Sequence, residues 1–260
     1  MNSAEEIWRK YDAMEARLAA PLTRRMLELA QLKPGMRVLD LATGRGEPAI
    51  PAAHVVGPGG RVVGVDPSDR MLAMARERAD DEGITNLELV AADAASIELT
   101  GFDVVFARWG LMYMAEPVKA LKAAAHALVP GGVIVAAVWA EPERVSWFSL
   151  GRQVLAKFAP VQPPDFEKPG VFFYSDVARL RRDLELAEFA IEHSEEFEVD
   201  VMEAQTGAEL IAWTRAFGMT KLLEGLPIAT QWAWEDELAR CVPRRLGGVT
   251  HLVVARTPFR

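Results

Sequence analysis

Residues 38–49 read VLDLATGRGEPA, an apolar run that ends in a Gly-x-Gly turn. An apolar strand followed by such a turn and a helix is how open α/β sheets present backbone N–H groups to a nucleotide-type cofactor. Gly44, Gly46 and Ala49 also satisfy the dinucleotide pattern G-x-G-x-x-G/A. The turn therefore predicts a nucleotide-type ligand, and the acidic residues around it must distinguish between cofactors.

Two acids beside the turn disfavour a ligand that carries phosphate. Glu47 follows Gly46 at the expected start of a helix, where a carboxylate would compete with phosphate for the same N–H groups. Asp40 ends the apolar run before Gly44, so we expect a second negative charge at the same crevice. These charges favour a ligand with a cationic end. S-adenosylmethionine has a sulfonium, an ammonium and an adenosine but no phosphate, and it has that character.

Two more aspartates follow apolar runs. Asp66 ends RVVGVD, and its two oxygens can accept hydrogen bonds from both ribose hydroxyls, a role that either cofactor would need. Asp93, in AADA, can accept from the adenine amino group, with the Ala94 N–H as the matching donor. We therefore expect three strands to end in aspartate on the same edge of one sheet.

Short apolar runs alternate with helical patterns through the first half of the chain, which is typical of a mostly parallel sheet with crossover helices. The predicted strands are 36–42, 61–66, 86–93, 102–107 and 132–140, and the predicted helices between them are 47–56, 68–82 and 116–128. Later elements are a helix at 175–186 capped by Ser175, a strand at 189–200, helices over roughly the next fifty residues, and a strand at 249–256. The prediction is an α/β fold: a Rossmann-like seven-stranded, mostly parallel sheet with helices on both faces, and a helical lid inserted around strands five to seven.

Composition excludes several classes of protein. The net charge is −8, and no block of Lys and Arg is longer than a pair, so nucleic acid is not an expected partner. The single cysteine, Cys241, forms no internal disulfide, and none of the four histidines has the spacing of a metal site. With no signal-peptide core and no run of about 18 apolar residues, we expect a cytoplasmic protein without membrane association.

The ordered set VLDLATGRGEPA, VVGVDPSDRML, AADA, FDVVFARWGLMYM and ALVPGG resembles the class I S-adenosylmethionine-dependent methyltransferases. It is most similar to the bacterial branch related to the ubiquinone/menaquinone-biosynthesis methyltransferases, over residues 35–140 and more weakly beyond. The resemblance implies an N-terminal helical flap (1–34), a cofactor-binding core (35–140), and the remainder of the sheet with substrate-binding lid insertions (141–260). One departure is Ala42, which stands where relatives often have glycine.

The resemblance also implies which residues bind S-adenosylmethionine. Asp40, Gly44 and Gly46 would hold the methionine part, and Asp66 the ribose. Pro67 and Met71 would flank adenine, with Asp93 and Ala94 at its edge. Ala42 belongs to the same turn, and Tyr11 lies in the flap, where packing in the core is the alternative. Arg108, after the fourth strand, would face the methyl donor or a substrate carboxylate, or else form a structural salt bridge to Asp40 or Glu47.

Aromatic residues at or beyond the fifth strand predict a pocket for a flat or hydrophobic small molecule. The expected substrate-binding residues are Trp109, Met112, Trp139, Trp147, Phe173 and Tyr174. Near the fourth strand no convincing base is present, so we expect methyl transfer to O, N or C mainly by proximity and alignment, with no catalytic residue assigned. Monomer and homodimer both stay open.

Two other classes of function remain. A nicotinamide-dependent oxidoreductase shares the sheet and Asp66, but Glu47 and the lack of a Tyr-x-x-x-Lys motif argue against it. A non-catalytic module that binds S-adenosylmethionine would have the same core, and only an activity assay distinguishes it from an enzyme.

Overall fold

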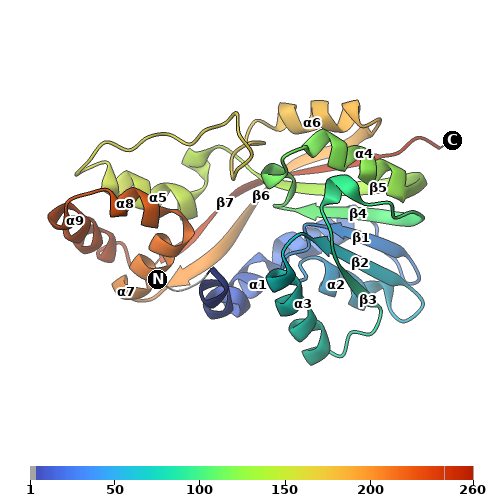
Figure 1. The fold of residues 1–260 in the computed structure, drawn as a ribbon, viewed down its shortest axis with the longest axis horizontal. Helices are drawn as coiled ribbons and strands as arrows, with labels where there is room; N and C mark the ends of the chain where they lie inside the picture. Colours follow the sequence, from blue (N-terminus) through green and yellow to red (C-terminus); the bar gives the residue numbers. More distant parts are fainter. Residues whose placement is uncertain (1–3, 243, 260) are drawn as a thin grey trace. The chain divides into compact units, whose positions relative to one another are not determined.

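The computed structural model describes residues 4–242 and 244–259, with side chains from residue 11 onward (Figure 1). Its seven-stranded sheet has the order β3-β2-β1-β4-β5-β7-β6. The strands are β1 (Arg37–Leu41), β2 (Arg61–Asp66), β3 (Leu87–Ala91), β4 (Phe102–Arg108), β5 (Leu128–Trp139), β6 (Ala190–Ala204) and β7 (Arg244–Arg256). The pairs β1–β2, β1–β4, β2–β3 and β4–β5 are parallel, and β5–β7 is antiparallel. The predicted α/β fold, with a seven-stranded and mostly parallel sheet, is confirmed.

Crossover helices connect the parallel strands, as the sequence pattern predicts. The helices that accompany these strands are α1 (Ala4–Leu29), α2 (Ala49–Val56), α3 (Asp69–Asp81), α4 (Pro117–Ala127) and α6 (Val177–Leu186). Two short 3₁₀ turns, η1 (Ala94–Ser96) and η2 (Leu111–Tyr113), follow β3 and β4. α4 and α6 contact each other and lie side by side in Figure 1. The predicted cap of α6 was wrong by one residue. The Asp176 side chain accepts the N–H of Ala178, whereas the Ser175 hydroxyl donates to the Phe172 carbonyl.

The central strands are buried along nearly their whole length. After an exposed first residue, every position of β1 and β2 is buried, and β4 is buried apart from the half-buried Asp103. Parallel strands covered on both faces have continuous apolar runs instead of an alternating pattern, which is what these sequences show. β3, at the sheet edge, is only half-buried or exposed. The core therefore holds the carboxyl ends of β1, β2 and β4 rigidly in register.

The chain divides into two compact units. The larger unit comprises Pro21–Trp139, Phe166–Phe197 and Thr250–Arg260, and the smaller one comprises Met1–Ala20, Ala140–Asp165 and Glu198–Val249. Elements of the smaller unit are η3 (Pro142–Arg144), α5 (Ser146–Leu155), α7 (Gly207–Thr214), a π-helical turn η4 (Arg215–Met219), α8 (Thr220–Glu224) and α9 (Ile228–Ala239). Within it, the fully buried Trp234 donates its indole N–H to the Gly151 carbonyl at 2.8 Å and so joins α9 to α5. These helices flank β6 in the sequence, where the lid was expected, and their action as a lid stays a prediction.

The α-helices of the described residues range in length from 5 to 26 residues. None of them is both long enough and apolar enough to cross a membrane.

Candidate functional site

A cavity of about 590 Å³ lies in the larger unit at the carboxyl ends of β1, β2 and β4. Its walls come from the glycine turn (residues 42–48), the β2–α3 junction, the loop after β3 and the segment after β4. The predicted cofactor-binding residues on its wall are Ala42, Gly44, Asp66, Pro67, Met71, Asp93 and Ala94. Trp109, predicted for the substrate, also lies there. Adjacent parallel strands thus bring residues from distant parts of the chain to one crevice.

Asp66 is the best-defined polar group of this cavity. It is 8% exposed, and its Oδ2 accepts the backbone N–H of Gly44 at 2.9 Å. Oδ1 accepts the N–H of Ser68, also at 2.9 Å. Since a carboxylate oxygen can accept two hydrogen bonds, both oxygens keep acceptor capacity for a ligand hydroxyl. Asp66 therefore joins the glycine turn to the start of α3 and presents paired acceptors.

Asp93 begins the 3₁₀ turn η1 on the neighbouring wall. Its Oδ1 accepts the N–H of Ala95 at 2.8 Å, which fixes the orientation of the side chain. Ala94, the next residue, is 5% exposed. The cap thus keeps Asp93 and Ala94 at the cavity as the sequence analysis expected.

Two adjacent strands end in residues with left-handed backbone conformation. The φ angle is +54° at Ala42, after β1, and +55° at Trp109, after β4. A Cβ on Gly110 would lie 2.5 Å from the Cβ of Ala42, so the two chains approach very closely here. For a residue other than glycine this conformation costs roughly 1–2 kcal/mol, which explains why glycine suits the position of Ala42. The strain is concentrated at the cavity wall.

Trp109 is held rigidly by four contacts. Its backbone N–H donates to the Ala137 carbonyl at 2.8 Å, and its indole N–H donates to the Thr250 hydroxyl at 3.2 Å. The ring stacks on Trp139 with a centroid separation of 4.4 Å, and the Arg108 guanidinium lies 4.8 Å from the ring centroid. Trp139 is 4% exposed, so the stack joins Trp109 to the buried core.

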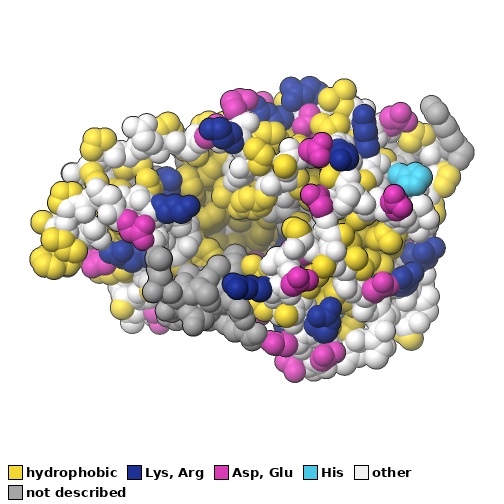
Figure 2. Space-filling model, viewed as in Figure 1, with side chains coloured by type: hydrophobic (Ala, Val, Ile, Leu, Met, Phe, Trp, Pro, Cys, Tyr) yellow, Lys and Arg dark blue, Asp and Glu magenta, His cyan; other side chains and the backbone are white. Residues whose placement is uncertain are grey.

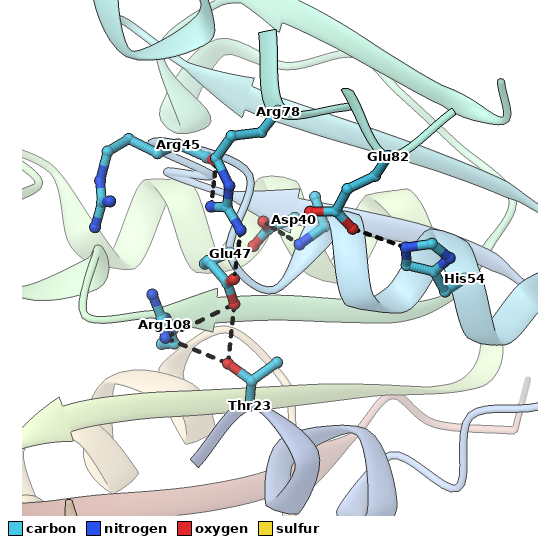
Figure 3. Close-up of polar contacts among 9 residues, drawn as sticks. Thr23, Asp40, Arg45, Glu47, His54, Arg78, Glu82 and Arg108 are labelled. Carbon is cyan, nitrogen blue, oxygen red and sulfur yellow. Dashed lines mark hydrogen bonds and ion pairs between the residues drawn. The ribbon is translucent and has the colours of Figure 1, made fainter. Parts of the chain in front are cut away.

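Glu47 belongs to the glycine turn, and its side chain is the centre of a charged cluster (Figure 3). Its side chain is 8% exposed. Its carboxylate accepts from the Thr23 hydroxyl at 3.1 Å and from Arg78 at 3.0 Å, and the Arg108 guanidinium lies 3.9 Å away. Thr23 in turn accepts from Arg108 at 3.2 Å. We call Thr23, Glu47, Arg78 and Arg108 the Glu47 cluster.

The charge of Glu47 is compensated in part by a residue that the sequence did not predict. Glu47 was expected to repel phosphate, but two guanidinium groups compensate its charge. The alternative interpretation of Arg108 as a structural ion-pair partner of Glu47 agrees with this geometry. Among the described residues, Arg108 is not on the wall of the cavity. Arg45 is also buried nearby, where desolvation, then the charges of Arg108 and Arg78, lower the pKa of its guanidinium to about 9.

Asp40 is fully buried at the end of β1. Its Oδ2 accepts from the Thr43 hydroxyl at 2.6 Å and from the N–H of Ala49 at 3.1 Å, so it satisfies the first N–H of α2. Burial raises the pKa of this carboxyl to about 7, although the bond from Thr43 and the charge of Arg108 partly oppose the shift. The expectation of a full negative charge at the crevice is therefore corrected, because the carboxyl is only partly ionised at neutral pH.

The structure places the other predicted site residues elsewhere. Among the described residues, Asp40, Gly46 and Met112 do not line the cavity, and Met112 is 1% exposed. Phe173 and Tyr174 pack by α6, where the Tyr174 hydroxyl donates to Asp183 at 2.9 Å and the Arg179 guanidinium lies over the Phe173 ring. Tyr11 and Trp147 belong to the smaller unit and contact Phe217 and Trp213, respectively. Their predicted roles stay predictions.

Several wall residues were not predicted from the sequence. They are Val65, Ser68, Ala92, Gly110, Tyr113, Met114 and Ala115. Ser68 had a usable signal, because a serine between a strand-ending aspartate and a helix is a typical N-cap. The spacing of the others gives no signal, because the turn η2 brings Tyr113 and Met114 to the cavity.

Charges of both signs are distributed over the surface. On the face drawn in Figure 2, basic and acidic side chains alternate and do not form one continuous patch. In the described part of the chain, no group of three or more His, Cys, Asp or Glu residues could hold a metal ion. The expectations about nucleic acid and metal are not tested by these observations.

Comparisons with known proteins support one family. Residues 32–155 match the family model described as a methyltransferase domain. The ubiquinone/menaquinone biosynthesis C-methyltransferase UbiE of Ectopseudomonas mendocina is 36% identical over 140 residues, which cover 51% of this chain and 55% of the relative. The aklanonic acid methyltransferase DauC of Streptomyces sp. strain C5 is 33% identical over 126 residues, covering 48% and 57%. The chain spans about half the length of these curated relatives.

Solved structures share the fold over a larger part of the chain. The [4+2]-cyclase SpnF has a TM-score of 0.60 at 22% identity, covering 93% of this chain and 82% of that one. A SAM-dependent methyltransferase from Aquifex aeolicus has a TM-score of 0.56 at 21% identity, covering 75% and 92%. At these identities the likeness shows the fold alone. Taken together, residues 32–155 match a methyltransferase domain, and this part of the chain is similar in sequence to the UbiE C-methyltransferases.

Proposed function

We propose that this protein transfers a methyl group from S-adenosylmethionine to a small aromatic or hydrophobic acceptor. The observation that carries the proposal is Asp66, which presents paired carboxylate oxygens beside the glycine turn in a cavity of about 590 Å³. A volume of this size accommodates a nucleoside-sized ligand. The walls also contain the mixture of apolar and polar groups that an adenosine requires.

The residues at the cavity fit an adenosyl group. Asp66 would accept from the ribose hydroxyls, Pro67 and Met71 would pack against the adenine, and Asp93 with Ala94 would bind its edge. Asp40, which precedes the turn, and Gly46, which belongs to it, are not on the cavity wall among the described residues and would act by shaping the backbone that faces the methionine part. The compensated charge of the Glu47 cluster makes the cavity suitable for a zwitterionic ligand as well as a cationic one.

S-adenosylmethionine supplies a methyl group that is already activated by the sulfonium. This chain must therefore bind the two reactants, orient them and exclude water from them. Alignment of the reactants can supply much of the acceleration. The titratable residues among those that line the cavity are Asp66, Asp93 and Tyr113. Both aspartates accept backbone N–H groups, which fixes their orientation and suits a binding role. We therefore infer an acceptor that is already nucleophilic at neutral pH.

The nature of the acceptor follows from the apolar part of the wall. Trp109, Tyr113 and Met114 lie together there, and Trp109 is fixed by its stack on Trp139. Rigid aromatic surfaces of this kind favour flat ligands. The name of one relative, a ubiquinone/menaquinone biosynthesis C-methyltransferase, supports a search that begins with aromatic carbon acceptors.

Calorimetric titration with S-adenosylmethionine, S-adenosylhomocysteine and NADH tests the cofactor. We expect both adenosyl ligands to bind and NADH not to bind. Transfer of labelled methyl to a panel of phenols, quinone precursors and amines then tests the activity. Binding without transfer to any acceptor would support a non-catalytic module, and binding of NADH alone would support an oxidoreductase.

A further inference from the structure

Arg78 contacts two residues of the glycine turn from the neighbouring helix α3. One of its terminal nitrogens donates to the backbone carbonyl of Arg45 at 2.9 Å, and the other donates to the Glu47 carboxylate at 3.0 Å. Figure 3 shows the guanidinium between these two acceptors. No role in the site has been assigned to Arg78 by the sequence motifs, and it is not on the cavity wall among the described residues. Its contacts are with the turn that forms the wall.

The backbone conformation of the glycine turn depends on contacts from the surrounding structure. Ala42, Gly44 and Gly46 all have left-handed φ angles, of +54°, +54° and +89°. A segment with alternating unusual dihedrals keeps one conformation only when its surroundings impose it. Asp66 holds the turn on the cavity side through the Gly44 N–H. Arg78 holds the following residues, Arg45 and Glu47, from the opposite side of the same peptide segment.

Arg78 also connects the turn to other elements through Glu47. The Glu47 carboxylate is bonded to Thr23 of α1 and faces Arg108 of β4, so three elements converge on one side chain. A buried carboxylate is tolerated only with partners of good geometry. Without Arg78, the carboxylate keeps the Thr23 hydroxyl at 3.1 Å, while the Arg108 guanidinium at 3.9 Å is beyond hydrogen-bond distance. The Glu47 carboxylate would then lose its hydrogen bond from a guanidinium, and the turn would lose both of its contacts with α3 through Arg78.

We infer that Arg78 is a positioning residue for the cofactor, which fixes the conformation of the glycine turn through the Arg45 carbonyl and the Glu47 carboxylate. This inference rests on the proposed function, because it presumes that the turn contacts an adenosyl ligand. It deepens that function by assigning a binding role to a residue outside the cavity. An arginine is suited to this task because its rigid planar fork reaches two acceptors simultaneously, which a lysine ammonium does less well.

The test compares Arg78→Met and Arg78→Lys with the matched control Arg76→Met. Arg76 lies on the same helix and is exposed, so its replacement removes the same charge without touching the turn. The dissociation constant for S-adenosylhomocysteine is measured by calorimetry, and hydrogen exchange is measured for residues 43–48. We expect Arg78→Met to weaken binding about ten- to a hundredfold, as a displaced binding group does, and to accelerate exchange in the turn. Arg78→Lys should be intermediate, and Arg76→Met should match the wild type.

The outcomes separate this inference from the proposed function. If the wild type itself fails to bind either adenosyl ligand, the proposed function is wrong and the inference falls with it. If the wild type binds and both Arg78 variants bind equally well, Arg78 has no positioning role. If Arg78→Met does not fold, Arg78→Lys decides the question, since it keeps the charge beside Glu47 and loses the second bond. Equal weakening by Arg76→Met would assign the effect to net charge and overturn the inference.

Discussion

The Asp66 carboxylate accepts the backbone N–H of Gly44 at 2.9 Å and so joins the end of β2 to the glycine turn after β1. Asp66 ends β2, and Gly44 follows the neighbouring parallel strand β1, in which Asp40 pairs with Gly64 and Leu41 with Val65. The register therefore places the carboxylate directly beside the turn. The same carboxylate accepts from Ser68, so one side chain orders two walls of the cavity.

Replacing Asp66 by asparagine should weaken the binding of both adenosyl ligands about ten- to a hundredfold. The amide cannot accept on both sides, and hydrogen bonds to a charged group contribute about 1.5–3 kcal/mol each. Asp69→Asn is the matched control, because Asp69 is an exposed acid in the first turn of α3. Calorimetry with S-adenosylhomocysteine measures the difference. Equal affinity in Asp66→Asn and the wild type would remove Asp66 from the binding site.

Gly46→Ala should be more destabilising than Gly35→Ala, although both glycines have nearly the same backbone conformation. Their φ angles are +89° and +85°, so each alanine incurs a similar backbone cost of roughly 1–2 kcal/mol. A Cβ on Gly46 would lie 2.6 Å from the Cδ1 of Ile50, whereas nothing lies within 4 Å of one on Gly35. Overpacking adds about 1–3 kcal/mol at Gly46 alone. Urea unfolding measures both free energies, and equal values would contradict the clash.

The raised pKa of Asp40 predicts that the stability of the protein depends on pH. This pKa is raised from 3.8 to about 7 in the folded protein, so between about pH 4 and 7 the folded state holds a proton that the unfolded state has released. The folded state binds more protons in this window, and the free energy of unfolding must fall as the pH rises through it. Above about pH 7 this contribution is constant.

Asp40→Asn tests this dependence, because asparagine can still accept from Thr43 and Ala49 through its oxygen. We expect the loss of stability between pH 5 and pH 8 to be smaller in the variant than in the wild type. Urea unfolding at the two pH values gives the comparison. The same pH-dependent change in both proteins would show that Asp40 titrates outside this range.

Trp109→Ala should lower the free energy of unfolding by about 2–4 kcal/mol, because it removes the stack on Trp139 and the bond to Thr250 while the backbone strain remains. Trp232→Ala is the control, since Trp232 is 61% exposed, and its removal should change stability by less than about 0.5 kcal/mol. Unfolding is followed by far-UV circular dichroism. A Trp109 variant as stable as the Trp232 variant would mean that the stack contributes nothing.

Much of the fold could be predicted because local patterns encode it. The apolar runs of β1, β2 and β4 are continuous since both faces are covered, and turns of glycine and proline separate them from the helices. The predicted strand at 132–140 starts four residues late, because β5 already begins at Leu128 with a register shift against β4. Irregular pairing of this kind has no simple sequence signal.

The partners of the charged residues could not be predicted in the same way. Glu47 lies close to Thr23, Arg78 and Arg108, which come from a helix before the sheet, a helix after β2 and the end of β4. No pattern of spacing connects these positions. The sequence predicted Glu47 and Asp40 as charges at the crevice, with a salt bridge from Arg108 to one of them as an alternative, and the structure shows Glu47 ion-paired and Asp40 fully buried.

The parallel sheet, the glycine turn and the aspartates near the strand ends are encoded locally, because periodicity and turn chemistry act over a few residues. The surroundings of each acid, and with them the raised pKa of Asp40, come from packing between distant segments. Ionisation depends on burial and on groups brought close by packing, and both are set when distant segments meet. The difference is clearest between Asp66, which is held by backbone N–H groups at the cavity, and Asp40, which burial leaves only partly ionised.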